Sequence, residues 1–130
     1  MLDEKEILDP VDLCDGQGEL NPGAVGWSRR PLHRCGLRGH PLRKKKWHYW
    51  MVTGPEHLFS VTVASVDYLS LAVIYTLEYE TGELFRDEQV RVLSDGGVSY
   101  PDGVYGDVLL ESRRYRIAIR HAPDGVRMEV

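Results

Sequence analysis

The stretch HLFSVTVASVDYLSLAVIYTLEY, residues 57–79, decides the fold. In its first half, Phe59, Val61 and Val63 alternate with smaller residues. This period of two is typical of a strand with one buried face. In its second half, both alternating sets are apolar as far as Ile74, which predicts a central or covered strand. A helix is disfavoured here because β-branched and aromatic residues dominate.

The same period of two extends in both directions from this stretch. In WHYWMVT, residues 47–53, Trp47 and Tyr49 share one face while His48 and Trp50 share the other. Further strands are expected in LFRDEQVRVL (84–93), VYGDVLLES (104–112), RRYRIAIRH (113–121), where Tyr115 joins the alternation, and VRMEV (126–130). Turn signals separate them: SDGG at 94–97 and APDG at 122–125, which is typical of a hairpin turn.

Strands at short spacing without helices predict an all-β fold, an antiparallel meander over residues 46–130 that forms a barrel or sandwich. Residues 1–45 hold four of the seven prolines and six glycines with no sustained period. We expect them to form an irregular segment that packs on the sheet. The chain reaches Val130 in mid-strand, which would leave an exposed edge. We therefore expect either an N-terminal part of a longer protein or association through the last strand. The expected partner is the remainder of its own chain or an edge-strand partner.

Charge is strongly segregated along the chain. The net charge is −4, yet residues 20–55 carry eight bases and no acid, and the segment RKKKWHYW (43–50) runs cations into aromatics. Such a strip could bind phosphates and stack bases. Trp47 and Trp50, however, lie three positions apart and point to opposite faces of a strand. A solvated loop leading into a strand is the better interpretation, and no nucleic-acid partner is expected. Binding of an anionic ligand or contact with an anionic membrane surface stays open as an alternative.

Other kinds of site find little support in the residue spacing. No apolar run is long enough for a transmembrane segment, and the acidic start lacks a signal peptide, so a cytoplasmic location is predicted. No metal site or cofactor is predicted, because the spacing of the candidate ligands does not match zinc motifs. Those candidates are Cys14, His33, Cys35, His40 and His48. No nucleophile motif occurs, and glycine-rich GQG and SDGG do not precede a helix as phosphate loops do.

The sequence LNPGAVGWSRRPL (20–32), followed by LRKKKWHYWMVT (42–53), resembles the domain of unknown function 2804 family. The matching positions are Gly18, Leu20, Asn21, Pro22, Gly26, Trp27, Ser28, Arg29, Pro31, Lys46, Trp47, Tyr49 and Trp50. The resemblance covers essentially the whole chain, although members of that family are more than twice as long. It implies a fold related to duplicated lipocalin-like barrels, similar to carotenoid hydratases and tocopherol cyclases, but it transfers no catalytic residue.

The resemblance implies that this chain is part of a lipocalin-like barrel. The expected ligand of such a barrel is a hydrophobic small molecule. One alternative is an enzyme acting on an isoprenoid- or lipid-like substrate, with Glu78 or Asp107 as acid–base candidates. A structural module with peripheral membrane contact is the other. The loop residue Trp27 is expected either to plug one end of the barrel or to gate the ligand. The predicted ligand-binding residues are Trp27, Arg29, Trp47, Tyr49, Trp50 and Tyr75.

Overall fold

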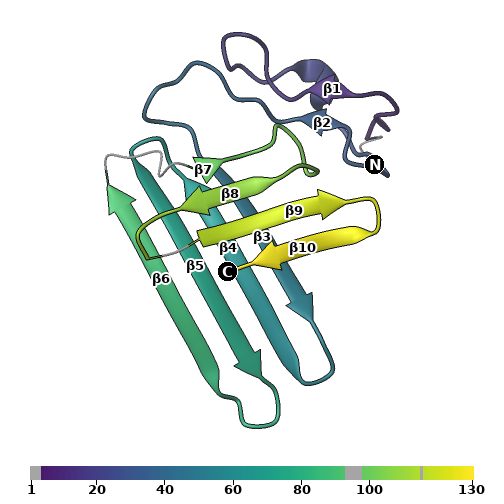
Figure 1. Ribbon diagram of the computed structural model, residues 1–130. Coiled ribbons are helices and arrows are strands. Elements are labelled where there is room, and N and C mark those ends of the chain that lie inside the picture. Colours follow the sequence, from purple (N-terminus) through teal and green to yellow (C-terminus); the bar gives the residue numbers. More distant parts are fainter. Residues whose placement is uncertain (1–3, 93–97, 115) are drawn as a thin grey trace.

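The computed structural model describes residues 4–92, 98–114 and 116–130 (Figure 1). The predicted SDGG turn at 94–97 and the predicted strand residue Tyr115 therefore lie outside the described residues. Elsewhere the chain forms short N-terminal elements followed by two four-stranded sheets. The elements are β1 (Val11–Asp12), η1 (Pro22–Ala24), β2 (His33–Arg34), β3 (Lys46–Thr53), β4 (His57–Ser65), β5 (Leu69–Glu78), β6 (Leu84–Val92), β7 (Val98–Ser99), β8 (Val108–Glu111), β9 (Arg116–Ala122) and β10 (Gly125–Glu129).

The first of these sheets, which we call the long sheet, is an antiparallel meander in the order β3-β4-β5-β6. Its strands are eight to ten residues long, because the alternating pattern continues unbroken between tight turns. One such turn is closed by the hydrogen bond from Gly54 N to the carbonyl of His57, at 2.8 Å. As predicted, β5 is central and pairs on both sides.

The second sheet has the order β10-β9-β8-β7 and is also antiparallel. The predicted APDG hairpin joins β9 to β10, where Ala122 pairs with Gly125 across the turn. Gly125 has a φ of 155°, a conformation that glycine reaches without steric strain. The predicted all-β fold of antiparallel meanders is confirmed.

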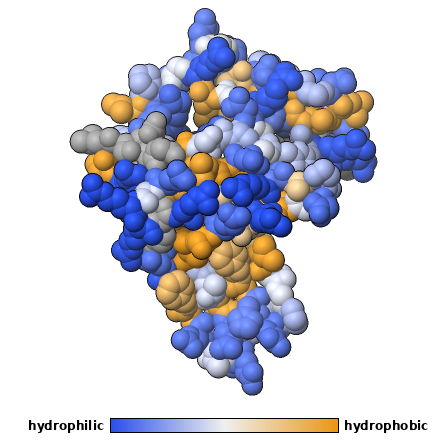
Figure 2. Space-filling view, viewed as in Figure 1, coloured by the Kyte–Doolittle hydropathy of each residue, from blue (hydrophilic) through white to orange (hydrophobic). Residues whose placement is uncertain are grey.

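The core lies between the two sheets. The long sheet contributes Val61, Val63, Ala72 and Ile74, and the second sheet contributes Val108, Leu110, Ile117 and Ile119. Figure 1 shows that the second sheet crosses only one end of the long sheet, so the hairpin ends of the long strands extend beyond it. We call this part the overhang. It includes the cross-strand row Val52, Phe59, Thr76 and Phe85 on the face turned toward the second sheet. Figure 2 shows apolar surface exposed there, next to β10.

The N-terminal segment lies at the other end of the long sheet (Figure 1). The two-residue strands β1 and β2 pair in parallel, and Arg34 of β2 holds Asp12 of β1 at 2.7 Å. The backbone of Cys35 donates a hydrogen bond to the carbonyl of Asp102, which ties this segment to the loop after β7. Within the described residues, no helix is long and apolar enough to span a membrane.

Candidate functional site

A groove runs along the free edge of β3. It has a volume of about 530 Å³ and lies between that strand and the loop at 101–104. It is lined by Cys35, Lys46, Trp47, His48, Tyr49, Trp50, Tyr100, Pro101, Gly103 and Val104. Most of this lining is aromatic or aliphatic, because β3 is an edge strand and exposes side chains from both of its faces here. We call it the β3 groove.

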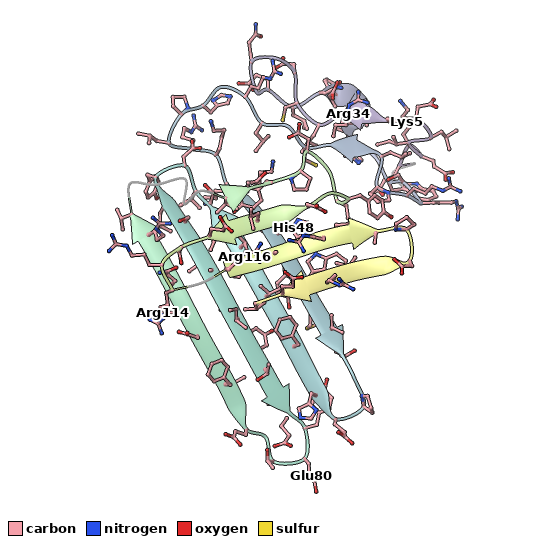
Figure 3. The ribbon with its side chains drawn as sticks, in the orientation of Figure 1. Lys5, Arg34, His48, Glu80, Arg114 and Arg116 are labelled. Atoms are coloured by element: carbon pink, nitrogen blue, oxygen red, sulfur yellow. The ribbon has the colours of Figure 1, made fainter. Side chains whose placement is uncertain are left out.

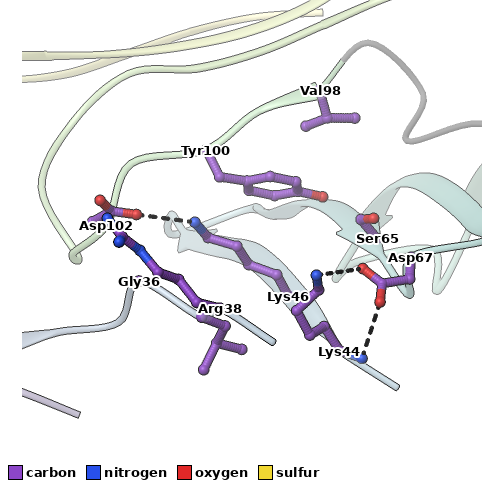
Figure 4. A pocket seen from close by; sticks show the side chains of 10 residues that line it. Gly36, Arg38, Lys44, Lys46, Ser65, Asp67, Val98, Tyr100 and Asp102 are labelled. Atoms are coloured by element: carbon purple, nitrogen blue, oxygen red, sulfur yellow. Dashed lines mark hydrogen bonds and ion pairs between the residues drawn. The ribbon is translucent and has the colours of Figure 1, made fainter. Parts of the chain in front are cut away.

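A second hollow adjoins the β3 groove at Lys46 and Tyr100, which line both. This cationic pocket has a volume of about 280 Å³ (Figure 4). Its lining is Gly36, Leu37, Arg38, Lys44, Lys46, Ser65, Asp67, Val98, Tyr100 and Asp102. Three cationic side chains thus face two carboxylates, so the pocket keeps an excess of positive charge.

The lysines of the cationic pocket are positioned by carboxylates on either side. Lys46 Nζ lies 3.7 Å from Asp102 and 5.4 Å from the centre of the Tyr100 ring. Lys44 Nζ lies 3.6 Å from Asp67. Figure 4 shows both lysines reaching into the pocket from the start of β3. Arg38 makes no ion pair with any described residue.

The hydroxyl group of Tyr100 is buried and has no hydrogen-bonding partner in the described part of the chain. Burial raises the pKa of this phenol, so it remains protonated. A buried hydroxyl without a partner is costly to the fold. The hydroxyl is therefore an unused hydrogen-bond donor beside the pocket.

On its inner side β3 carries a cluster of aromatic rings. Trp50 Nε1 donates a hydrogen bond to His48 Nε2 at 2.8 Å, which places the His48 proton on Nδ1. The ring of His121 from β9 lies 6.4 Å from that of His48 and 5.7 Å from that of Trp50, centre to centre. Figure 3 shows His48 between the two sheets. Burial lowers the His48 pKa, and the nearby charge of His121 adds to the effect.

We expect acid to destabilise the fold through His48. Its folded pKa lies below the unfolded value of about 6.5. Between these two values the unfolded chain binds more protons, so the free energy of unfolding falls as the pH drops below about 6.5, and it levels off below the folded pKa. Urea denaturation at a series of pH values measures this. His48→Gln should flatten the dependence of the unfolding free energy on pH, whereas the exposed control His57→Gln should leave that dependence unchanged. An unchanged slope in His48→Gln would contradict the assignment.

The structure brings together three of the six residues predicted to bind a ligand. Trp47, Tyr49 and Trp50 line the β3 groove. Tyr75 lies on the face of the long sheet that points away from the second sheet, where it pairs with Ser60 of β4. The ligand-binding role of these three groove residues was predicted from the family resemblance, but the groove itself depends on a loop fifty residues later.

The other two predicted residues, Trp27 and Arg29, contact each other. The Arg29 guanidinium lies 5.1 Å from the Trp27 ring and 3.0 Å from Glu6. They do not line the groove, and their role in ligand binding stays a prediction. The acid–base candidates also lie outside the groove. Glu78 lies 3.7 Å from His57, and Asp107 accepts a hydrogen bond from the backbone of His121.

Sequence reasoning missed the residues that give the site its polarity. Tyr100, Asp102 and Asp67 sit in turns without any period, and nothing in their spacing connects them to Lys44 or Lys46. Only the basic run at 43–46 indicated an anionic ligand, and it did not show where that ligand would bind.

Comparison with known proteins gave one result. A family model described as Domain of unknown function (DUF2804) matches residues 4–130. No curated protein and no solved structure matches the chain. The more distant likeness to carotenoid hydratases and tocopherol cyclases therefore stays a prediction.

Proposed function

Because this chain belongs to the DUF2804 family, whose description assigns no function, we propose from the site itself that the domain binds an amphipathic small molecule. The apolar body of the ligand occupies the β3 groove, and its anionic group, a carboxylate or phosphate, enters the cationic pocket. The observation that carries this proposal is that the two hollows adjoin each other and share Lys46 and Tyr100 in their linings.

Size and lining support a ligand of this class. Small-molecule sites are typically concave, mostly apolar, and roughly 300–1,000 Å³ in volume, with a few polar groups that fix orientation. The β3 groove falls in this range at about 530 Å³. Its aromatic side chains offer flat surfaces to an isoprenoid or acyl chain.

Charge supports an anionic end group. Arg38 lacks a carboxylate partner, and the Tyr100 hydroxyl lacks any partner in the described residues. A carboxylate in the cationic pocket would accept hydrogen bonds from both and would approach the ammonium of Lys46. Hydrogen bonds to charged groups contribute roughly 1.5–3 kcal/mol each. A neutral alcohol of the same chain length would lose most of this contribution.

Titration with dodecanoate and with dodecanol tests the proposal, with tryptophan fluorescence as the readout because Trp47 and Trp50 line the groove. We expect dodecanoate to change the emission and to bind at least about tenfold more tightly than dodecanol, which corresponds to 1.4 kcal/mol. Replacing both Trp47 and Trp50 by phenylalanine should remove most of the signal, whereas Trp27→Phe should leave it unchanged. Equal affinity for the two compounds, or no change in emission with either, would overturn the proposal.

A further inference from the structure

The long sheet has a second face, which we call the outer face, that points away from the second sheet. Read across β3, β4, β5 and β6, its four rows are Trp47, Ala64, Leu71 and Val90; Tyr49, Thr62, Val73 and Glu88; Met51, Ser60, Tyr75 and Arg86; and Thr53, Leu58, Leu77 and Leu84. Arg86 and Glu88 pair with each other at 2.6 Å and are the only charged residues in these rows.

The outer face is largely apolar, although no described element covers it. Trp47 is 66% exposed, Leu84 is 59% exposed and Val90 is 51% exposed. The largest apolar patch on a typical monomer measures roughly 300–600 Å² and often marks a binding surface. Four strands about 4.8 Å apart and eight residues about 3.4 Å apart give this face roughly 500 Å² before side-chain relief is counted.

One polar atom on the outer face also lacks a partner. Ser60 is fully buried by its neighbours, and its Oγ has no hydrogen bond in the described part of the chain. The hydroxyls of Tyr49 and Ser60 are close enough to that of Tyr75 to lower the Tyr75 pKa, but the Ser60 contact lacks hydrogen-bond geometry. The Ser60 hydroxyl is therefore enclosed by side chains of its own chain and lies out of reach of a partner.

We propose that the outer face binds the outer face of a second copy of this chain, with the two long sheets face to face about a twofold axis parallel to their strands. Such an axis lays each row on the same row of the partner in reverse order. The proposal rests on the pairing of sizes and polar groups that this reversal produces.

In the first row, the large Trp47 meets the small Val90 of the partner, and Leu71 meets Ala64. In the second row, the Tyr49 hydroxyl meets the Glu88 carboxylate. In the first row large side chains therefore lie over small ones, and in the second row a donor lies over an acceptor. Packed faces of this kind resemble a β-sandwich core with sheets about 10 Å apart.

The area is sufficient for a stable dimer. Two faces of roughly 500 Å² bury at least about 1,000 Å² in total, which is the lower limit for a specific interface. Burying the exposed Arg86–Glu88 ion pair costs desolvation free energy, which the apolar contacts of the other rows must exceed.

Sedimentation analysis over a concentration series, with Val90→Glu as the disrupting variant, tests this dimer. We expect the unmodified chain to show twice its 14.8 kDa mass, and Val90→Glu to weaken dimerisation at least about tenfold, because its carboxylate would be buried against Trp47. The matched control is Phe85→Glu, at a residue 60% exposed on the other face of the same strand. It should leave the dimer intact.

A second variant tests the row-by-row arrangement. Met51→Glu would face Arg86 of the partner, so it should not weaken the dimer, although it adds a charge to the same apolar face. Circular dichroism should show that all three variants are folded. A chain that stays monomeric at its highest soluble concentration would overturn the proposal. So would a control Phe85→Glu that weakens the dimer as much as Val90→Glu, or a Met51→Glu that does so.

Discussion

Replacing Ile119 by alanine is expected to lower the free energy of unfolding by about 3 kcal/mol, within the roughly 2–5 kcal/mol seen for such truncations in cores. Ile119 is completely buried on β9, between Val108 of β8 and Met128 of β10. It packs in the cluster that holds the second sheet on the long sheet. Alanine would remove three methyl or methylene groups and leave a cavity, because residues on rigid paired strands collapse only partly.

Urea denaturation, followed by circular dichroism, measures this loss. A protein of this size has a total stability of roughly 5–15 kcal/mol, so the midpoint should fall markedly. Leu8→Ala is the matched control, since Leu8 is 74% exposed and should cost less than about 1 kcal/mol. Equal costs for the two variants would mean that the second sheet is not held by the core described above.

Replacing Lys46 by methionine is expected to weaken the binding of dodecanoate by roughly 10- to 100-fold, the equivalent of 1.4–2.7 kcal/mol. Lys46 is the residue at which the β3 groove meets the cationic pocket. Methionine keeps much of the length of the side chain but removes the ammonium. It would also leave Asp102 without its partner, so that a carboxylate ligand would face a carboxylate.

Calorimetric titration with dodecanoate and dodecanol measures this effect. The variant should lose affinity for the acid and keep its affinity for the alcohol. The control is Lys45→Met, because the exposed Lys45 lies beside the same strand but does not line either hollow. An equal loss of affinity for dodecanoate in Lys45→Met would show that Lys46 acts only through the general positive charge of the surface.

Much of the fold could be predicted from residues whose chemistry repeats. The alternation of Phe59, Val61 and Val63 identified β4 and its buried face, because a strand places every second side chain on the same side. The same rule separated Trp47 and Tyr49 from His48 and Trp50, and the structure confirms this division. The turn at 122–125 was predictable because proline restricts φ and glycine allows positive values of φ.

The site could be predicted only in part, because it is built by tertiary contacts between segments with no shared pattern. Lys46 is near Tyr100 and Asp102 only because the loop after β7 returns to the edge of β3. Trp27 and Arg29 formed a distinctive string in the sequence, but they stack on each other because Glu6 holds the guanidinium. The separation of two residues along the sequence does not show whether they make such a tertiary contact.

The overhang of the long sheet has a consequence for local opening of the fold. Residues near Val52 and Phe85 have backbone hydrogen bonds within the sheet but little apolar packing above them, whereas Val61 and Ile74 on the neighbouring strands lie in the core. The free energy of local unfolding follows such differences in burial. Amide hydrogens along one and the same strand should therefore exchange with solvent at graded rates, fast at the hairpin ends and slow beneath β9. Protection from exchange should thus differ more between the two ends of each long strand than between neighbouring strands.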